Sequence, residues 1–254
     1  MDLYETLFSH IGVQNNNEDI SEAYKQGALD NERAFWAVYQ DNGKPQRYMR
    51  AFWDKRWTNE TFKPYFDIIN DSSSASGAFY ATGISGDLVE LLTKRGKELY
   101  GENHPGLKMD FSQSADIASL FSGATKITHV PVIDASNSGS LAYLFTNCTS
   151  LKIIDGLILN AEKNAEGGYG GAFSCAVLEE ISDIQGYFGG SVTFKLCVML
   201  NKETIKRIVK ALLPNIEKAT LTLSKKAVDN VFTTEEWDAF VQENKPAGWT
   251  ISLA

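Results

Sequence analysis

Apolar residues recur at a fixed interval along much of this chain, and the interval is clearest between Leu144 and Ala161. Phe145 is followed by an apolar residue at every third position, namely at Cys148, Leu151, Ile154 and Leu157. The same steps follow Phe121, and they follow Phe173 with one residue missing. A period of three fits neither a helix, with about 3.6 residues per turn, nor a strand, with a period of about two. It indicates a chain that turns a corner every few residues and directs an apolar side chain inward each time.

Each unit of the pattern begins with Ala-Phe or Leu-Phe, and the phenylalanines are Phe52, Phe79, Phe121, Phe145 and Phe173. They are separated by 27, 42, 24 and 28 residues, and roughly 20–29 residues is the period of leucine-rich repeats. The long spacing contains DLVELLTKRGKEL, which predicts an inserted helix over Asp87–Leu99. A single unit cannot bury its own apolar face, so we expect neighbouring units to stack and share one core.

A short stretch of alternating apolar and polar residues follows each unit and predicts a β-strand. The predicted strands are Tyr65–Ile69, Leu107–Phe111, Val130–Ala135, Leu157–Ala161, Val192–Leu196, Thr220–Ser224 and Thr250–Leu253. We expect these strands to stack in parallel and to form one curved sheet. The pattern therefore predicts an α/β fold built from repeats.

The motif F-x-x-C-x-x-L-x-x-I of Phe145–Ile154 resembles the BspA-like leucine-rich repeat, which occurs in bacterial surface proteins and in phage-encoded proteins. Arg56–Ile68 resembles the segment that leads into such repeats, and Leu221–Ala254 resembles their terminal cap. The chain departs from the motif with Ala124 in place of cysteine and with the shortened unit at Phe173. The resemblance implies a leucine-rich-repeat solenoid with a parallel strand stack.

This resemblance divides the chain into an N-terminal helical segment over residues 1–50 and a solenoid over residues 51–254. The N-terminal segment contains one predicted helix, from Asp19 or Ser21 to Gln40. The aromatic end of this helix either covers the open core of the first repeat as a cap, or its earlier part associates with other subunits.

The C-terminal cap begins at about residue 201 and consists of strands and helices. Apolar residues at helical spacing predict a first helix over Asn201–Pro214. A second helix starts at Thr233, which forms a capping box with Glu236. Each helix leads into a predicted strand.

The composition limits the partners of the protein. With 24 Lys and Arg against 32 Asp and Glu, the net charge is -8, and nucleic-acid binding needs clustered Lys and Arg instead. No apolar run approaches the roughly 18 residues of a membrane span. The N-terminal sequence MDLYETLFSH has acidic residues where a signal peptide has basic ones, so no signal peptide is visible.

No motif for catalysis, a cofactor or a metal stands out in the sequence. The three cysteines lack the spacing of a metal site or disulfide framework and are expected to be small buried residues; they are Cys148, Cys175 and Cys197. The three histidines lie in no metal-binding motif; they are His10, His104 and His129. Gly167–Gly171 lacks the Lys-Ser/Thr of a phosphate loop, so it predicts a flexible rim loop with Tyr169 as a candidate contact. We expect no enzymatic activity, no cofactor and no bound metal.

One row of polar residues is the candidate binding site. The middle, outward positions of the predicted strands are Asp67, Asp110, Asp134, Asn160, Lys195, Thr222 and Ser252. In one parallel sheet, neighbours in this row would lie about 4.8 Å apart, so the row would offer carboxylates to a glycan, a peptide or a cation. Alternatively, the row is only the solvated side of the sheet. A shift of register by one residue would move it to the other face.

Two functions follow from the repeats and the resemblance. The first is a non-enzymatic recognition or adhesion protein, on the cell surface or secreted, which presents its repeat surface to a protein or glycan. The alternative is a structural protein associated with a phage or prophage tail. In that case the N-terminal helix would attach it to the virion or to further copies of the chain.

Overall fold

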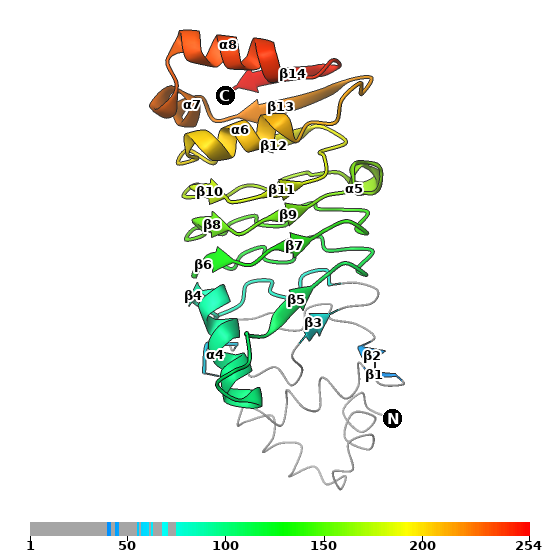
Figure 1. Cartoon of the computed structure of the whole chain (residues 1–254), viewed down its shortest axis with the longest axis vertical. Coiled ribbons are helices and arrows are strands. Elements are labelled where there is room, and N and C mark those ends of the chain that lie inside the picture. The colour runs from blue at the N-terminus through cyan, green and yellow to red at the C-terminus, as the bar shows by residue number, and fades with distance from the viewer. Residues whose placement is uncertain are drawn as a thin grey trace, which may run out of the picture.

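The computed structural model describes residues 40–41, 44–45, 55, 57–60, 62, 68–70 and 75–254 of the chain. These residues form a mixed α/β structure whose sheets consist mainly of parallel strands (Figure 1). Phe52, Asp67 and all but the last residue of the predicted N-terminal helix lie outside the described residues. Gln40, which we expected to end that helix, instead begins strand β1 (Gln40–Asp41), which pairs antiparallel with β2 (Lys44–Pro45).

The middle of the chain forms two short strands in each turn of the chain, where we predicted one. The first strands are β6 (Ile127–Val130), β8 (Ile153–Ile154) and β10 (Glu180–Ile181), and the second strands are β7 (Ile133–Asp134), β9 (Leu157–Ile158) and β11 (Ile184–Gln185). With β4 (Gly86–Asp87), they form two parallel sheets of order β10-β8-β6-β4 and β11-β9-β7. The predicted strand Val130–Ala135 is divided because a corner between the sheets lets both Val130 and Ile133 point into the core.

The seven predicted strands therefore do not form one sheet. β3 (Ile68–Asn70) pairs with β5 (Lys108–Asp110), apart from the sheets of the middle region. β12 (Val192–Phe194), β13 (Ala219–Leu223) and β14 (Trp249–Leu253) form a third parallel sheet. The prediction of a single curved sheet is wrong because β9 pairs with β11, which the sequence analysis did not recognise as a strand.

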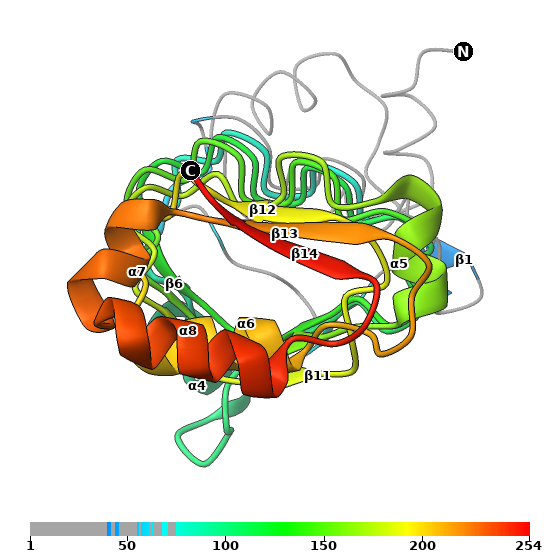
Figure 2. The ribbon, with the colours of Figure 1, turned by 90° about the horizontal axis from the view of Figure 1, so that it is seen from above.

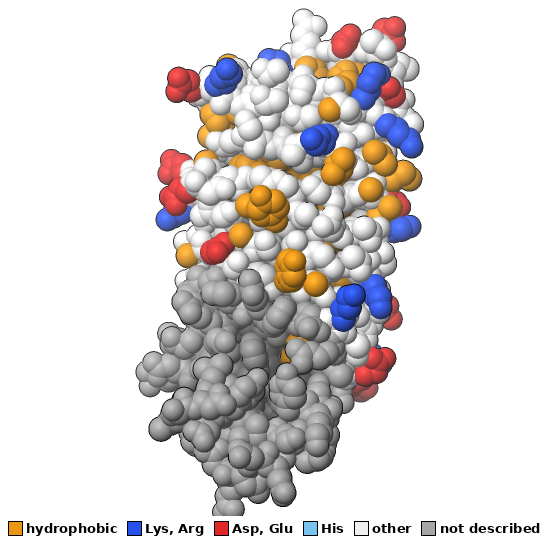
Figure 3. All heavy atoms as spheres, turned by 180° about the vertical axis from the view of Figure 1, so that it is seen from behind, with side chains coloured by type: hydrophobic (Ala, Val, Ile, Leu, Met, Phe, Trp, Pro, Cys, Tyr) orange, Lys and Arg blue, Asp and Glu red, His pale blue; other side chains and the backbone are white. Residues whose placement is uncertain are grey.

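A third side of the middle region, which we call the turn face, consists of the tight turns around Phe79, Phe121, Phe145 and Phe173. Backbone hydrogen bonds connect each turn to the next, from Phe79 N to Leu120 O (2.8 Å), from Phe121 N to Leu144 O (2.9 Å) and from Phe145 N to Ala172 O (2.9 Å). Two residues before each phenylalanine, φ is positive, at Gly77, Ser119, Tyr143 and Gly171. Uncharged polar side chains and backbone make up most of the described part of this side (Figure 3).

The phenylalanines of the turns stack into a continuous column in the core. Ring centroids lie 5.1 Å apart between Phe79 and Phe121, 5.6 Å between Phe121 and Phe145, and 4.3 Å between Phe173 and Phe194. The step-of-three pattern thus correctly predicted the buried residues of these turns, except for Ile184, which is half-buried. Tyr169, which we expected as a contact in a rim loop, lies in the core with 2% of its surface exposed.

The three cysteines form a second buried column beside the phenylalanines. The thiols of Cys148, Cys175 and Cys197 donate to the backbone oxygens of Phe121, Phe145 and Phe173 at 3.0, 3.1 and 3.0 Å. All three thiols are free. Burial raises the pKa of Cys197 to about 12, so this thiol stays protonated and keeps its role as a donor. Their position in the core agrees with the sequence analysis.

The helices agree with the sequence analysis in part. α4 (Leu88–Tyr100), α6 (Lys202–Lys210) and α8 (Thr234–Asn244) were predicted, including the capping box of Thr233 and Glu236. α5 (Ala161–Gly167) and α7 (Lys225–Val231) were not. None of the helices in the described residues has the length and apolar character needed to cross a membrane.

The C-terminal unit has helices on one side and a sheet on the other. Seen from the C-terminal end, β12, β13 and β14 lie along one side, α6 and α8 lie along the opposite side, and α7 lies at one end between the two sides (Figure 2). Trp237 of α8 and Trp249 of β14 are both buried between them. This unit closes the C-terminal end of the core.

Candidate functional site

The structure does not assemble the predicted row of polar residues. Asp134 lies opposite Ile158 in the register of β7 and β9, so Asn160 is not its neighbour. Asn160 follows the strand and caps α5, where its side chain accepts from Lys163 N at 3.2 Å. Lys195 lies just beyond β12. The row is therefore wrong as a geometric prediction, because it assumed one sheet and one register.

The two described aspartates of that row have local roles. The carboxylate of Asp110 accepts from Ser112 N at 2.9 Å, and that of Asp134 accepts from Ser136 N at 2.9 Å. Such bonds to the second following residue stabilise turns. Thr222 and Ser252 are the two members of the row that do pair across strands, with a hydrogen bond of 3.2 Å between their hydroxyls.

The structure instead brings together His129, Asp87 and Asp155 on three neighbouring turns of the chain. His129 Nδ1 lies 2.8 Å from Asp87 Oδ2, and His129 Nε2 lies 2.6 Å from Asp155 Oδ1. His129 belongs to β6, Asp87 to β4 on one side, and Asp155 follows β8 on the other. We call these three residues the Asp-His-Asp bridge.

The two carboxylates favour the charged form of the histidine. Burial lowers the pKa of His129, but the hydrogen bonds and charges of Asp155 and Asp87 raise it, and the net shift is upward. Because carboxylate oxygens only accept hydrogen bonds, an imidazolium with two N–H donors satisfies both sides at once. The bridge therefore joins three turns of the chain through one shared cation.

Asp87 also begins helix α4. One of its oxygens accepts from Glu90 N at 2.9 Å, which is the side-chain bond of an N-cap. Burial raises the pKa of Asp87, whereas the bonds from Glu90 N and His129 lower it, and the net shift is downward. A single carboxylate thus connects the helix to the bridge.

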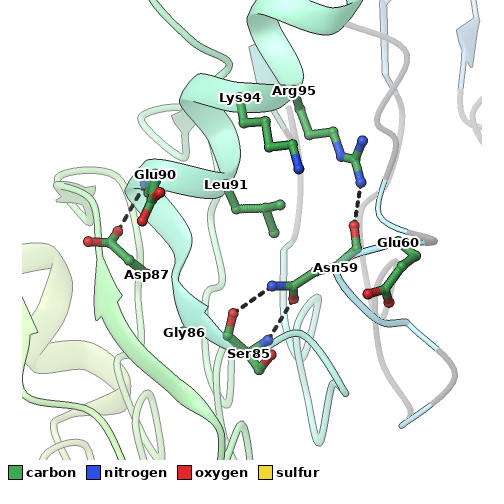
Figure 4. A pocket seen from close by; sticks show the side chains of 9 residues that line it. All are labelled: Asn59, Glu60, Ser85, Gly86, Asp87, Glu90, Leu91, Lys94 and Arg95. Atoms are coloured by element: carbon green, nitrogen blue, oxygen red, sulfur yellow. Dashed lines mark hydrogen bonds between the residues drawn. The ribbon is translucent and has the colours of Figure 1, made fainter.

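A cavity of about 320 Å³ opens beside Asp87, at the start of α4 (Figure 4). It is lined by Asn59, Glu60, Ser85, Gly86, Asp87, Glu90, Leu91, Lys94 and Arg95. Asn59 fixes one wall, because its side chain donates to Ser85 O at 2.9 Å and accepts from Ser85 N at 2.8 Å. The cavity is polar and shaped by bonds between segments far apart in the sequence.

Arg95 of α4 fixes a second wall of the cavity (Figure 4). The residue is buried, its guanidinium donates to Asn59 O, and it forms an ion pair with Glu98. In contrast, Lys94 and Glu90 are exposed at the cavity. The lining therefore has fixed walls and exposed groups of both charges, which suits a ligand with several hydrogen-bonding groups.

The arrangement favours binding over chemistry at His129. Both ring nitrogens are engaged by carboxylates, so neither is free to act as a base or as a metal ligand. Among the described residues, no group of three or more His, Cys, Asp and Glu side chains is arranged to hold a metal ion. What remains for a ligand is the polar cavity and the charged groups at its mouth.

Sequence reasoning missed this site for a specific reason. Asp87 lies 42 residues before His129, across the helix inserted between two repeats. Asp87 and His129 nevertheless occupy equivalent positions, eight residues after Phe79 and Phe121, so the repeat carried a signal for this pair. The predicted row took only the middle positions of the predicted strands, and Asp155 is shifted to ten residues after Phe145.

Comparisons of the chain with protein-family models, with curated proteins and with solved structures find no match in any of the three.

Proposed function

We propose that the chain is a leucine-rich-repeat solenoid that acts as a non-enzymatic recognition module for a protein or glycan. The parallel strands of neighbouring turns and the columns of phenylalanine and cysteine support the solenoid, since each turn repeats the same inward positions. We also propose that the chain is related to the BspA-like leucine-rich repeats that its motif resembles. Such arrays provide long, rigid surfaces for large partners.

The observation that carries the proposal is the polar cavity at α4 together with the Asp-His-Asp bridge. The cavity has hydrogen-bonding groups of both kinds around its mouth, and its walls are fixed by Asn59 and Arg95. A pre-formed polar site loses little conformational entropy on binding. We assign the partner to the glycan or protein ligands of an extracellular or virion surface.

The test is binding of the purified chain to arrays of glycans and of extracellular-matrix proteins. The double variant Glu90→Gln/Lys94→Gln removes one charge of each sign from the cavity and keeps the backbone cap of α4. The control Glu162→Gln/Lys163→Gln makes the same changes on the exposed side of α5. We expect at least a tenfold weaker binding for the cavity variant, equivalent to about 1.4 kcal/mol, and no change for the control.

Two results would overturn this assignment. Equal binding by the cavity variant and the wild-type chain would show that the cavity is not the binding site. Cleavage of a bound glycan, detected by mass spectrometry, would show that the protein is an enzyme. If no array component binds, the alternative of a phage-tail structural protein gains weight. Copurification of the chain with virions would then be the direct test.

A further inference from the structure

The C-terminal end of the molecule carries a second surface, separate from the cavity at α4. β14 is the last strand of its sheet and pairs on one side only, with β13. Seen from the C-terminal end, no described element lies over β14 (Figure 2). The sheet therefore has an open edge at this end.

The register shows which backbone groups face that edge. Gly248 O accepts from Ala219 N, and Ala254 N donates to Leu223 O, so the even-numbered residues of β14 bond to β13. Alternate residues of a strand direct their N–H and C=O groups to opposite sides. The N–H and C=O groups of Ile251 and Leu253 consequently point to the open edge and bond to no other described residue.

The edge of β14 is protected only at its start, where Lys245 Nζ donates to Trp249 O at 3.1 Å. Natural edges are blocked by lysine, proline, a bulge or a covering element. β14 reads WTISL, and its pairing with β13 is regular over all five residues. Its two polar side chains, Thr250 and Ser252, are small and uncharged, so they leave room for another strand at about 4.8 Å.

A hollow of about 630 Å³ lies next to this edge, between α7, α8 and the end of β14. Its apolar lining comes from Val228, Phe232, Trp237 and Leu253. Because Leu253 lines the hollow, a residue opposite Leu253 on an added strand would point its side chain to the same side of the sheet. The open edge and the hollow can thus be occupied by one segment.

The charges around the hollow select the kind of side chain that enters it. Asp229, Glu235 and Asp238 line it, and Lys225 is its one lining cation and is already paired with Asp229 at 2.6 Å. Glu235 and Asp238 form no ion pair with any described residue. An apolar floor with a carboxylate rim fits the aliphatic stem and charged end of Lys or Arg.

The molecule already contains one example of this chemistry. Lys202 Nζ lies 4.7 Å from the centre of the Phe232 ring and 3.0 Å from Glu236 Oε2. A cation over an aromatic face and beside a carboxylate is favourable. In the hollow, Trp237 and Phe232 each leave 8% of their surface exposed, beside the carboxylates of Glu235 and Asp238.

We propose that this end docks an extended cationic segment of a partner protein, which adds to β14 as a further strand and inserts a Lys or Arg side chain into the hollow. Strand addition supplies affinity through backbone hydrogen bonds, and the hollow supplies specificity. A second copy of the chain is a poorer occupant, because residues 225–254 carry five carboxylates and three lysines and two such ends repel each other.

The probe is a labelled seven-residue peptide of alternating threonine and valine with a central arginine, acetylated and amidated. We expect the chain to bind it, and we expect at least tenfold weaker binding when the central arginine is replaced by glutamate. Glu235→Gln/Asp238→Asn in the protein should weaken binding by a similar factor. The control Glu162→Gln/Asp183→Asn removes the same charge from exposed sites elsewhere and should bind as the wild type does.

Hydrogen exchange locates the peptide independently of affinity. Bound peptide should slow exchange of the Ile251 and Leu253 amides, and N-methylation of the peptide residues that face β14 should abolish this protection. Absence of binding, equal binding by the two double variants, or binding without protection of these amides would each overturn the proposal.

Protection of the same amides in the protein alone, with a dimer in solution, would assign the edge to a second copy instead. The α4 variant Glu90→Gln/Lys94→Gln leaves this surface intact, so the two proposals can fail separately.

Discussion

The middle region and the C-terminal unit use different means to close the same core. In the middle region, each turn has two very short strands and a tight turn, and its core consists of columns of identical residues. In the C-terminal unit, longer strands on one side face amphipathic helices on the other (Figure 2). Longer helices and strands therefore take over in the C-terminal unit the role that short strands and tight turns have in the middle region.

The difference shows how stability is distributed. A residue in a column of the middle region contacts its equivalents on both sides, so its loss affects neighbouring turns. A residue in a C-terminal helix is held by its own helix and by the sheet opposite. We expect truncations in the middle region to spread along the stack, and truncations in the C-terminal unit to remain local.

Phe145→Ala should have the largest effect. Its ring is fully buried and lies 5.6 Å from Phe121 and 6.1 Å from Phe173, so the variant leaves a cavity in the middle of the column. We expect a loss of about 3–5 kcal/mol in the free energy of unfolding, measured by urea denaturation. Tyr80→Ala removes a ring that is 44% exposed near the same face and should cost about 1 kcal/mol or less. Similar losses of unfolding free energy for Phe145→Ala and Tyr80→Ala would contradict the packing of Phe145 in a buried column.

Ile208→Ala tests the C-terminal unit. Ile208 is fully buried on α6, so we expect a loss of about 3 kcal/mol. Hydrogen exchange should speed up in α6 and β13 but not in the turns around Phe121 and Phe145. Lys210→Ala on the exposed side of the same helix is the control. Faster exchange throughout the stack would show that the two regions unfold as one unit.

His129→Gln should have a smaller effect that depends on pH. The folded-state pKa of His129 is raised, so its contribution is fully present below the unfolded pKa of about 6.5 and is lost as pH rises through the folded pKa. Asp87 has a lowered pKa, so its contribution is lost at acid pH. We expect the variant to lose about 1 kcal/mol at pH 5.5 and less at pH 8.5, in thermal unfolding at both values. His104→Gln, which removes a histidine outside the bridge, is the control, and an equal loss at both pH values for His129→Gln would contradict the charged bridge.

The sequence predicted the inward residues better than the pairing of strands. Phe145, Cys148, Leu151 and Ile154 are buried as the step of three required, because an inward position depends only on local corners. Pairing depends on how many strands each turn contains, and β11 has no distinct pattern of its own. Asn160 was therefore assigned to a strand, although it caps a helix.

The candidate site was predictable only in part. Asp87 and His129 lie eight residues after Phe79 and Phe121, and the pairing of β4 with β6 places them side by side. The predicted row took only the middle positions of the predicted strands, so it left this pair out. Asp155 lies ten residues after Phe145, and its contact with His129 across that shift is seen only in the structure.

Asp134→Ala should have the smallest effect and directly tests the corrected pairing. Asp134 has one side-chain bond, to Ser136 N at 2.9 Å at the surface, and lies opposite Ile158. We expect a loss of about 0.5 kcal/mol and unchanged binding on the glycan and protein arrays. Asp155→Ala is the informative partner variant, because it removes one side of the Asp-His-Asp bridge and should cost more. If Asp134→Ala lowers the free energy of unfolding more than Asp155→Ala does, or abolishes binding, the predicted polar row would be the better candidate for the binding site than the region of the Asp-His-Asp bridge.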